Sequence, residues 1–419
     1  MLHAFLVAAS FAHVIPQPPP DLPAAVYRER RERVMKELGG CATAIAAQGE
    51  VSGVTEDFKQ DDDFFWLTGV TEPGAWLVLT PKQKYTRTAL YLKSRDPEAE
   101  RWTGPRDAIT PALKDKFGVD QVRRGSGAGS LLFAGQSTDC FAIIAPLSGL
   151  KDERPDVAAV RQAAGALGMK VVYKRDLLSK LRTAHGEEEI ARMERAIAIT
   201  RAGHEAAARA TVAGVSERDV QTQLEYAFFA NGATGLSYPS IVGSGENGAV
   251  LHWDKNSRML RDGDLVVMDA AAEYGRYAAD VTRTFPVSGK FNEEQAKAYR
   301  AVYQVQEEIF AAIRPGVSMA DLQHVAEEAM RRQGYLDKFI HGFGHFVGLN
   351  VHDAGNLEQP IPPGAVFTVE PGVYLPERGF GVRIEDEVLV LPNGKARLLT
   401  AGFPRKLEDV EEWVARARR

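Results

Sequence analysis

The sequence predicts a two-domain protein: a small α/β domain, followed by an α+β domain of helices laid over antiparallel ribbons. In the first half, residues 41–174 alternate short apolar runs with helical patterns, as α/β domains do. In the second half, a helix followed by a two-stranded ribbon occurs twice, about a hundred residues apart. This internal repeat predicts two half-domains related by a pseudo-two-fold axis.

The first domain is predicted to span residues 1–178, including an apolar and proline-rich extension over residues 1–23, and the second to span residues 186–419. Residues 177–186 carry no strong apolar period, so the linker between the domains is placed there. Within the first domain, residues 24–38 predict a helix that is charged on one face. No glycine-rich phosphate-binding loop accompanies these elements.

Capping residues define the helices of the second domain. Ser216, Asn292 and Ser318 are predicted N-caps, for helices that end near Asn231, Pro315 and Gly334. A final amphipathic helix is predicted over residues 406–418. The segments AGVSERDVQTQLEYAFFANG and PGVSMADLQHVAEEAMRRQG match in register for twenty residues, which makes the helices that begin after Ser216 and Ser318 equivalent.

Two aspartates occupy the first predicted ribbon. Asp269 and Asp280 are equally distant from Tyr274-Gly275, so a two-residue turn there would place them directly opposite each other. Opposed like charges destabilise a ribbon, which indicates a cation between them.

The second ribbon repeats the pattern. Residues 364–370 (GAVFTVE) echo residues 263–269 (GDLVVMD), so that Glu370 and Glu385 take the places of the two aspartates. Between the ribbons lies HGFGHFVGLNVHDAG, whose glycines favour a strand or tight bend over a helix, and His345 is its predicted ligand. Four carboxylates and one imidazole would balance two divalent cations, and this oxygen-rich set favours Mn²⁺ or Co²⁺ over structural zinc, with Zn²⁺ as a further alternative.

A single acid on a ribbon is usually a solvated surface residue. These acids, however, interrupt apolar runs in VVMDA and FTVEP, where an unpaired charge is costly. We therefore predict a metalloenzyme in which two cations activate water and polarise a carbonyl.

The composition is that of a soluble globular enzyme, with 419 residues, 45 % apolar and 26 % charged. A net charge of -5 without a long basic run argues against nucleic acid or an anionic membrane as a partner. Cys41 and Cys140 are too few for a disulfide framework or a zinc cluster, so we expect them to be buried or incidental. The first twenty residues contain an apolar stretch, but no Lys or Arg precedes it and no small-x-small site ends it, so a cytoplasmic protein is expected and export is the alternative.

Four segments, DAAAEYGRYAADVTRTFP, HGFGHFVGLNVHD, TVEPGVY and GVRIED, together resemble the metal-binding segments of the pita-bread metallopeptidases. They are most similar to the proline-specific branch, which contains aminopeptidase P and prolidase. The resemblance covers the whole second domain, includes YPSIVGSGENGAVLHW, and extends to FKQDDDFFWLTGVTEP and ERWTGPR in the first. It implies the pita-bread (creatinase/aminopeptidase-like) fold for residues 186–419.

The resemblance also implies roles for the matching positions. Asp269 would chelate one metal, Asp280 and Glu385 would bridge both, and His345 with Glu370 would complete the other site. Glu370 would in addition accept the proton of the attacking water. The remaining roles are proton handling and substrate orientation for His252 and His352, and lining or support of the substrate pocket for Tyr238, His341, Tyr374 and Arg383.

The function implied is a two-metal exopeptidase, using Mn²⁺, that cleaves the bond between an N-terminal residue and a following proline. The alternatives are a dipeptidase for Xaa-Pro, an exopeptidase of altered specificity such as a carboxypeptidase, and a non-catalytic binding module. Peptides are the expected partners, and the family implies a homo-oligomer, either a dimer or a tetramer. The linker LRTAHGEEE lacks the proline common in relatives, and the first domain's thin match leaves specificity open.

Overall fold

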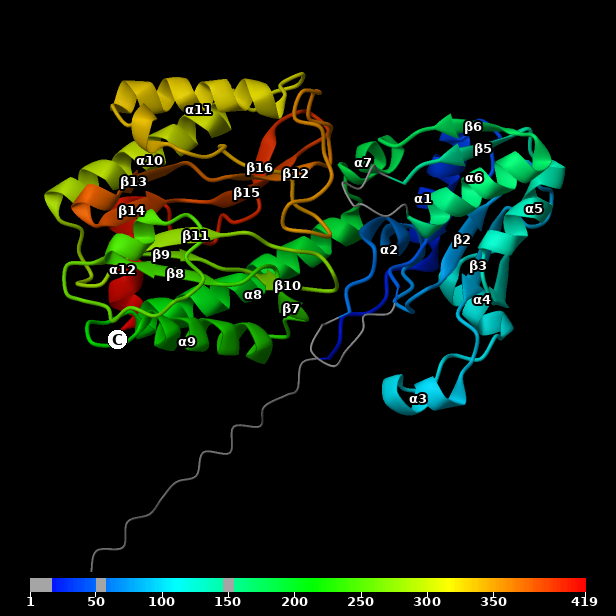
Figure 1. Cartoon of the computed structure of the whole chain (residues 1–419). Helices are drawn as coiled ribbons and strands as arrows, with labels where there is room; N and C mark the ends of the chain where they lie inside the picture. The colour runs from blue at the N-terminus through cyan, green and yellow to red at the C-terminus, as the bar shows by residue number, and fades with distance from the viewer. Residues whose placement is uncertain (1–16, 50–57, 146–153) are drawn as a thin grey trace, which may run out of the picture. The chain divides into compact units, whose positions relative to one another are not determined.

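The computed structural model describes residues 17–49, 58–145 and 154–419 (Figure 1). Its contacts define two compact units, each with its own apolar core. The N-terminal unit comprises residues 21–185 and 354–356, and the catalytic unit comprises residues 186–353 and 357–419 together with residues 17–20. Most of the predicted apolar extension, residues 1–16, lies outside the described residues.

The N-terminal unit contains a mixed sheet. Strands β1 to β4 pair in sequence order, β5 pairs with β6, and a bridge between Ala42 and Phe141 joins the two sets. The strands are β1 (Thr43–Ala46), β2 (Trp76–Leu79), β3 (Thr88–Leu92), β4 (Gln121–Arg124), β5 (Cys140–Ile143) and β6 (Lys170–Tyr173). The helices are α1 (Ala24–Glu37), α2 (Asp62–Thr68), α3 (Pro97–Thr103), α4 (Pro111–Phe117), α5 (Leu131–Ala134), α6 (Pro155–Leu167) and α7 (Leu177–Arg182). This is the α/β architecture that the sequence predicts.

The segment predicted as the linker between the domains contains a helix. Helix α7 occupies Leu177–Arg182, and Leu177 and Leu178 are buried, 8 % and 1 % exposed. Arg182 forms a buried ion pair with Asp63, with 2.6 Å between Nη1 and Oδ1. A helix of six residues is too short to show an apolar period, and here it depends on tertiary burial.

The two cysteines form a disulfide, which was not predicted from the sequence. Cys41 lies two residues before β1, Cys140 begins β5, and a bond of 1.99 Å joins their sulfur atoms. Both side chains are buried, as expected, but they are not incidental. The pairing arises because the backbone of Ala42 hydrogen-bonds to Cys140, which brings positions 99 residues apart in sequence into contact.

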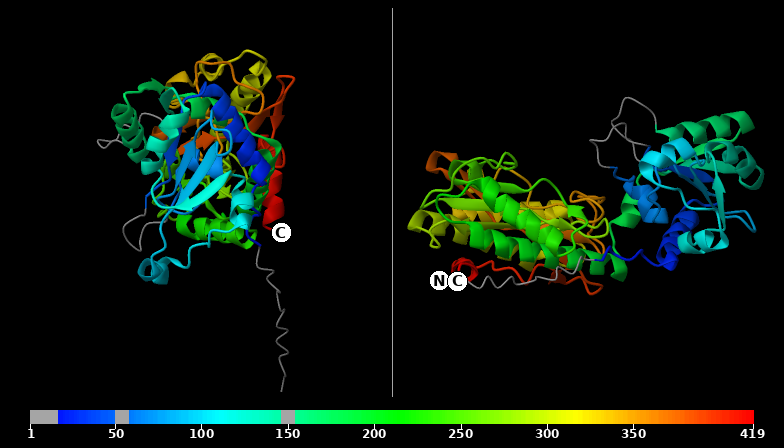
Figure 2. Two further views of the ribbon diagram at one scale, coloured as in Figure 1. Left: turned by 90° about the vertical axis from the view of Figure 1, so that its right-hand side faces the viewer. Right: turned by 90° about the horizontal axis from the view of Figure 1, so that it is seen from below.

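In the catalytic unit, the ribbons lie between two pairs of helices. Figure 1 shows α8 (Glu187–Ala210) and α9 (Glu217–Ala230) on one side of the strands, and α10 (Glu293–Ala312) and α11 (Met319–Gln333) on the other. Seen from below, the green helices α8 and α9 cover the strands, as the right panel of Figure 2 shows. Helix α12 (Leu407–Ala417) packs on α8 and β11. Within the described ranges, no helix is long and apolar enough to cross a membrane.

The strands form two three-stranded sheets and two short ribbons. One sheet has the order β11-β9-β8 and the other β12-β15-β16, while β10 pairs with β7 and β13 with β14. The strands are β7 (Gly235–Leu236), β8 (Ile241–Ser244), β9 (Leu265–Asp269), β10 (Ala272–Glu273), β11 (Thr282–Pro286), β12 (Val366–Val369), β13 (Gly372–Leu375), β14 (Phe380–Arg383), β15 (Asp386–Val390) and β16 (Ala396–Leu398).

The internal repeat is confirmed in the backbone. Helices α9 and α11 both begin with a capping box, formed by Ser216 with Asp219 and by Ser318 with Asp321. Each capping serine also makes an isolated bridge to the segment that precedes the following ribbon. The pattern of helix followed by ribbon therefore has the same local chemistry in both halves.

The register predicted for the first ribbon is wrong. Asp269 pairs with Thr282 rather than with Asp280. The turn is centred on Gly275-Arg276, because both residues adopt positive φ angles, 58° and 76°, as a tight two-residue hairpin turn of type I′ requires. A glycine fits either central position of such a turn, so the sequence did not decide between two registers. Because the shift equals two residues, it leaves Asp280 on the face that carries Asp269.

The second ribbon shows the opposed arrangement that was predicted for the first. Val369 pairs with Asp386 and Gly372 pairs with Arg383, so this register places Glu370 opposite Glu385. Each ribbon thus delivers two carboxylates to the same region of the unit.

Reduction of the Cys41–Cys140 bond is expected to destabilise the N-terminal unit by about 2–5 kcal/mol, because the bond closes a loop of 99 residues. Urea unfolding with and without a phosphine reductant would measure this. The Cys41→Ala/Cys140→Ala double variant is the control, since its stability should not respond to the reductant. A wild-type unfolding curve that the reductant leaves unchanged would contradict the expectation.

Candidate active site

The four predicted acids converge, and each comes from the end of a strand. Asp269 ends β9, Asp280 precedes β11, Glu370 follows β12, and Glu385 stands between β14 and β15. Asp269, Asp280 and Glu385 are buried, at 8 %, 4 % and 1 % exposure, and Glu370 is partly buried. Strand ends allow the backbone to leave the ladder, so these side chains can point inward together.

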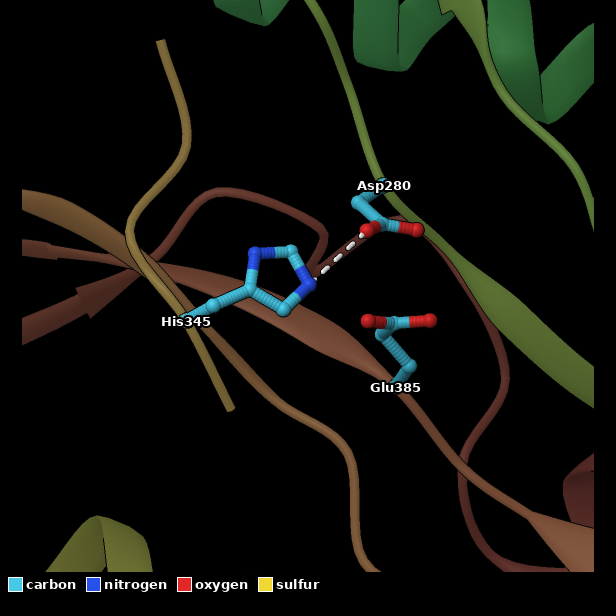
Figure 3. A group of neighbouring side chains, drawn as sticks. All are labelled: Asp280, His345 and Glu385. Carbon is cyan, nitrogen blue, oxygen red and sulfur yellow. Dashed lines mark ion pairs between the residues drawn. The ribbon is translucent and has the colours of Figure 1, made fainter. Parts of the chain in front are cut away.

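Three of the predicted residues could contact a single cation. Ligand atoms of Asp280, His345 and Glu385 all lie within 4.8 Å of one another. Figure 3 shows the three side chains pointing toward a common point from separate segments of the chain. The His345 Nε2 atom lies 3.3 Å from Asp280 Oδ2 and 3.4 Å from Glu370 Oε1, so Glu370 adjoins the same group.

Tyr238 links the two aspartates of the first ribbon. Its hydroxyl oxygen lies 2.6 Å from a carboxylate oxygen of Asp269 and 2.6 Å from one of Asp280. A phenol has one proton and can donate it to only one of them. The second short contact therefore requires either a proton on a carboxyl group or a cation nearby. Burial, reinforced by the charges of Asp269 and Asp280, raises the pKa of Tyr238 well above its usual value.

Burial within the cluster raises the pKa values of three of its acids. Burial raises the pKa of Glu370 to about 7, with His345 opposing the rise. Burial, together with the neighbouring carboxylates, also raises the pKa values of Asp269 and Glu385. For His345, burial favours the neutral ring, but the hydrogen bond and charge of Asp280 outweigh it and raise the pKa to about 9. The cluster therefore retains protons unless a cation replaces them.

Arg383 is the fixed positive charge of the site. Its guanidinium donates to Asp269 (2.5 Å), to the Tyr374 hydroxyl (2.9 Å) and to Thr282 Oγ1 (3.1 Å). The Tyr374 hydroxyl lies 2.8 Å from His341 Nε2, and His341 Nδ1 lies 2.7 Å from the Gly342 carbonyl. Nδ1 therefore donates to that carbonyl and Nε2 accepts from Tyr374, which describes a neutral ring. Burial and the charge of Arg383 accordingly lower the pKa of His341 to about 4.

A cavity of about 480 Å³ opens onto the acids. Of the predicted pocket residues, Tyr238, His341 and Arg383 line it, whereas Tyr374 stands behind Arg383 and His341 and is not in the lining. The two predicted catalytic histidines line it as well: His252, His352. The His352 ring packs edge-on against His345, with 4.1 Å between the ring centroids. Burial and the neighbouring His345 lower the pKa of His352.

Two supporting residues escaped the sequence analysis. Thr282 donates a hydrogen bond of 2.6 Å to Glu385, and Glu387 accepts one of 2.5 Å from the backbone N–H of Asp280. Glu387 is fully buried, and burial raises its pKa well above the usual value. The sequence gives little signal for it, because Glu387 follows two other acids, Glu385 and Asp386, at the start of the apolar run VLVL.

The donor set fits divalent metal ions. Four carboxylates and an imidazole share a site where Arg383 and protonated His345 are the cationic side chains among the described residues. The Tyr238 hydroxyl lies 2.6 Å from an oxygen of each aspartate but has a single proton to donate, and burial raises the pKa values of Glu370 and Glu385. Such a set gains by exchanging its protons for oxygen-preferring divalent cations.

Comparison with known families agrees with this geometry. The model of metallopeptidase family M24 matches residues 191–392, and that of the aminopeptidase P N-terminal domain matches residues 27–134. The Xaa-Pro aminopeptidase of Escherichia coli is 32 % identical, with 94 % of this chain and 98 % of the relative covered. Human Xaa-Pro aminopeptidase 3 is 29 % identical, with 95 % and 87 % covered.

Solved structures show the same fold along almost the whole chain. Aminopeptidase PepP of Pseudomonas aeruginosa superposes with a TM-score of 0.85 at 29 % identity, covering 95 % of this chain and 99 % of that one. Aminopeptidase P of Escherichia coli in its low-pH form gives 0.83 at 29 % identity, with 96 % and 100 % covered. A zinc-substituted form of the latter in complex with product gives 0.82 at 29 % identity, again with 96 % and 100 % covered.

Fold and site together define a metal-dependent hydrolase of peptides, with the pita-bread fold in its catalytic unit. The chain belongs to metallopeptidase family M24 and carries the N-terminal domain of aminopeptidase P.

Mn²⁺ is expected to raise the melting temperature of the protein, and by more at about pH 7.5 than at about pH 5. The pKa of Glu370 is raised, so in the metal-free protein its contribution to stability is complete below the ordinary pKa of 4.5 and is lost as pH rises through about 7. As pH rises over the same interval, protons also compete less with Mn²⁺ for the carboxylates. The raised pKa of His345, about 9, likewise stabilises the metal-free protein at low pH, and this contribution is lost as pH rises.

Thermal unfolding with Mn²⁺ or with a chelator, across this pH range, measures the effect. A Glu385→Gln variant serves as the control and should respond less to Mn²⁺. A melting temperature indifferent to both additives at about pH 7.5, or a larger metal effect at about pH 5, would overturn the metal assignment.

Proposed function

We propose that this chain is a two-metal Xaa-Pro aminopeptidase, which releases the N-terminal residue of a peptide whose second residue is proline. The observation that carries the proposal is the convergence of the acids and His345 on one cavity. Relatives named Xaa-Pro aminopeptidase, similar over nearly their full length, support it. The proposed domain limits are residues 1–178 and 186–419.

The proposed metal ligands are Asp269, Asp280, His345, Glu370 and Glu385. Asp269 would serve one ion, Asp280 and Glu385 both, and His345 with Glu370 the other. Mn²⁺ is the proposed metal because four of the five ligands offer oxygen, with Co²⁺ and Zn²⁺ as alternatives. A zinc-substituted relative shows that such a fold accepts zinc. When bound, two such ions supply a nucleophile near neutral pH and polarise the scissile carbonyl.

Glu370 is the proposed proton acceptor. Its carboxylate lies on the cavity wall beside His345, 3.4 Å away, and is partly open to the cavity. A group that takes a proton from water and passes it to the leaving nitrogen works best with a pKa near the operating pH. In the metal-free protein, burial already moves the pKa of Glu370 to about 7, in the direction this role needs.

His252 and His352 are proposed to orient the substrate and handle protons at the carbonyl. Both line the cavity on segments separate from the ribbons. The lowered pKa of His352, caused by burial and by His345, favours a neutral ring that donates or accepts a hydrogen bond without adding charge. Tyr238, His341, Tyr374 and Arg383 are the proposed binding and supporting residues.

The lining of the cavity favours an aminopeptidase over a dipeptidase. A dipeptidase must hold the C-terminal carboxylate of its substrate. Of the described residues that line the cavity, Arg383 alone is a lysine or arginine, and its guanidinium is engaged with Asp269 and Tyr374. The apolar wall formed by Ile241, Leu251 and Val351 offers contact for a pyrrolidine ring, which has no N–H to satisfy.

We further propose that the protein is a homo-oligomer, a dimer or tetramer, and that the exported alternative fits it better than a cytoplasmic location. Trp102 and Tyr85 on the N-terminal unit are 85 % and 79 % exposed, which is typical of contact surfaces.

Disulfides persist in oxidising compartments, and the Cys41–Cys140 bond therefore favours export. Light scattering and fractionation of a tagged chain test these two statements.

Mass spectrometry of products tests the function directly. Xaa-Pro, Xaa-Pro-Yaa, Xaa-Pro-Yaa-Zaa and an N-acetylated tetrapeptide would be incubated with the protein and Mn²⁺. Release of the free N-terminal residue from the longer peptides, blocked by acetylation, is expected. Cleavage of the dipeptide alone would instead identify a dipeptidase, loss of residues from the C-terminus would identify a carboxypeptidase, and no cleavage would reject the proposal.

Asp280→Asn is expected to abolish turnover while leaving the fold intact, since Asp280 is proposed to serve both metals and its backbone N–H remains bonded to Glu387. Circular dichroism and peptide turnover measure the two effects. Asp262→Asn, an exposed acid upstream of the same ribbon, is the matched control and should retain turnover. An active Asp280→Asn enzyme would rule out the two-metal site.

A further inference from the structure

Glu217 is a buried carboxylate outside the acid cluster. It is the first residue of α9 and is fully buried. Its two oxygens accept hydrogen bonds from the following groups: Ser244 N (2.7 Å), Ser244 Oγ (2.7 Å), Asn247 Nδ2 (3.0 Å), Trp253 Nε1 (2.9 Å) and Arg258 N (3.0 Å). A carboxylate with this many donors is fully satisfied and holds them in one arrangement.

The donors to Glu217 share one segment of the chain. They lie between Ser244, the last residue of β8, and Arg258 in the connection to β9, and they flank His252 on both sides. Trp253 is the neighbour of His252, and its indole N–H fixes the direction of the backbone there. This segment also supplies Leu251 and Asp254 to the cavity wall. A loop of this length needs such anchors to present a side chain at a fixed position.

The middle of the same segment packs closely on the ribbon that carries Arg383. A Cβ atom at Gly381 would lie 2.0 Å from the Gly248 carbonyl oxygen, so only glycine fits at this contact. The connection is therefore held between β14 on one side and Glu217 on the other.

The internal repeat shows that the fold alone does not require this carboxylate. Ser216 and Asp219 correspond to Ser318 and Asp321 in the second capping box, so Glu217 corresponds to Met319. Met319 is equally buried, 2 % exposed, and begins an equivalent helix without any charge. A methionine suffices for the helix start, and the acid occurs in the half that must hold the His252 segment.

We propose that Glu217 is a positioning residue, which anchors residues 244–258 so that His252 faces the substrate. The inference rests on the proposed function, because His252 is assigned its role there. Glu217 touches neither the acids nor the cavity lining, and it acts through the loop.

A double-mutant cycle tests the proposal. Glu217→Ala in the otherwise unchanged protein is expected to lower kcat/KM for an Xaa-Pro-Yaa peptide by about 10- to 100-fold, as misplacement of a substrate-orienting group does. In a His252→Ala background, the same substitution should change kcat/KM by less than about threefold, because the group it positions is already absent. Glu217→Gln, which keeps one acceptor oxygen, should fall between wild type and Glu217→Ala. Equal losses in both backgrounds would overturn the proposal.

Ser216→Ala is the matched control for structural damage. It removes the cap of the same helix but none of the bonds to residues 244–258. We expect it to lower the melting temperature while leaving kcat/KM near the wild-type value. A loss of kcat/KM as large as that of Glu217→Ala would mean that Glu217 only supports the helix.

Amide hydrogen exchange gives a readout that does not depend on turnover. Glu217→Ala should speed exchange at the amides of Ser244 and Arg258, which bond directly to the carboxylate, and Ser216→Ala should not. A wild-type protein that does not cleave Xaa-Pro peptides would reject the proposed function only. Unchanged exchange in Glu217→Ala would reject the anchoring itself.

Discussion

The repulsion among four clustered carboxylates is the constraint on which the catalytic unit is built. Two ribbons bring Asp269, Asp280, Glu370 and Glu385 together, three of them buried and Glu370 partly buried, where water screens their charges little. The positive charge of Arg383 and several hydrogen-bond donors reduce this repulsion. Their compensation is partial, since Asp269, Glu370 and Glu385 are left with raised pKa values. Electrostatic repulsion therefore remains in the folded protein, and the binding of divalent cations relieves it.

A second polar layer behind the acids keeps the ribbons from relaxing away from one another. Arg283 and Asp386 form a fully buried ion pair of 2.6 Å, and Arg283 also donates to the carbonyl of Glu385. From α10, Gln306 donates to the carbonyls that immediately precede Glu370 and Glu385, at 3.0 and 3.2 Å. The bonds from Arg283 and Gln306 to these carbonyls hold the backbone rather than the acidic side chains. The positions of the acids are therefore set by main-chain geometry, which apolar packing alone would define less sharply.

Local patterns in the sequence were enough to predict most helices of the catalytic unit and its cluster of acids. Caps such as Ser216 and Ser318, and acids such as Glu370 that interrupt apolar strands, carry their signal within a few residues, and the helices and the cluster were predicted from them. What failed depended on distant partners or on degenerate turns. Gly275 fits either central position of the turn, so the predicted register of the first ribbon was wrong. The Cys41–Cys140 bond depends on β1 and β5 lying side by side, which the local sequence does not show. Glu217 was missed because its partners, in residues 244–258, adjoin it only in the folded chain.

The two halves of the repeat are not interchangeable. Each helix-and-ribbon unit carries two acids, and neither unit encloses a complete site, so the four acids meet only where both units pack together. The halves differ at the start of the repeated helix: Glu217 bonds to residues 244–258 in one half, and Met319 takes its place in the other. A pseudo-symmetric set of acids is thus combined with an asymmetric cavity wall, and a bound peptide meets different side chains in its two directions.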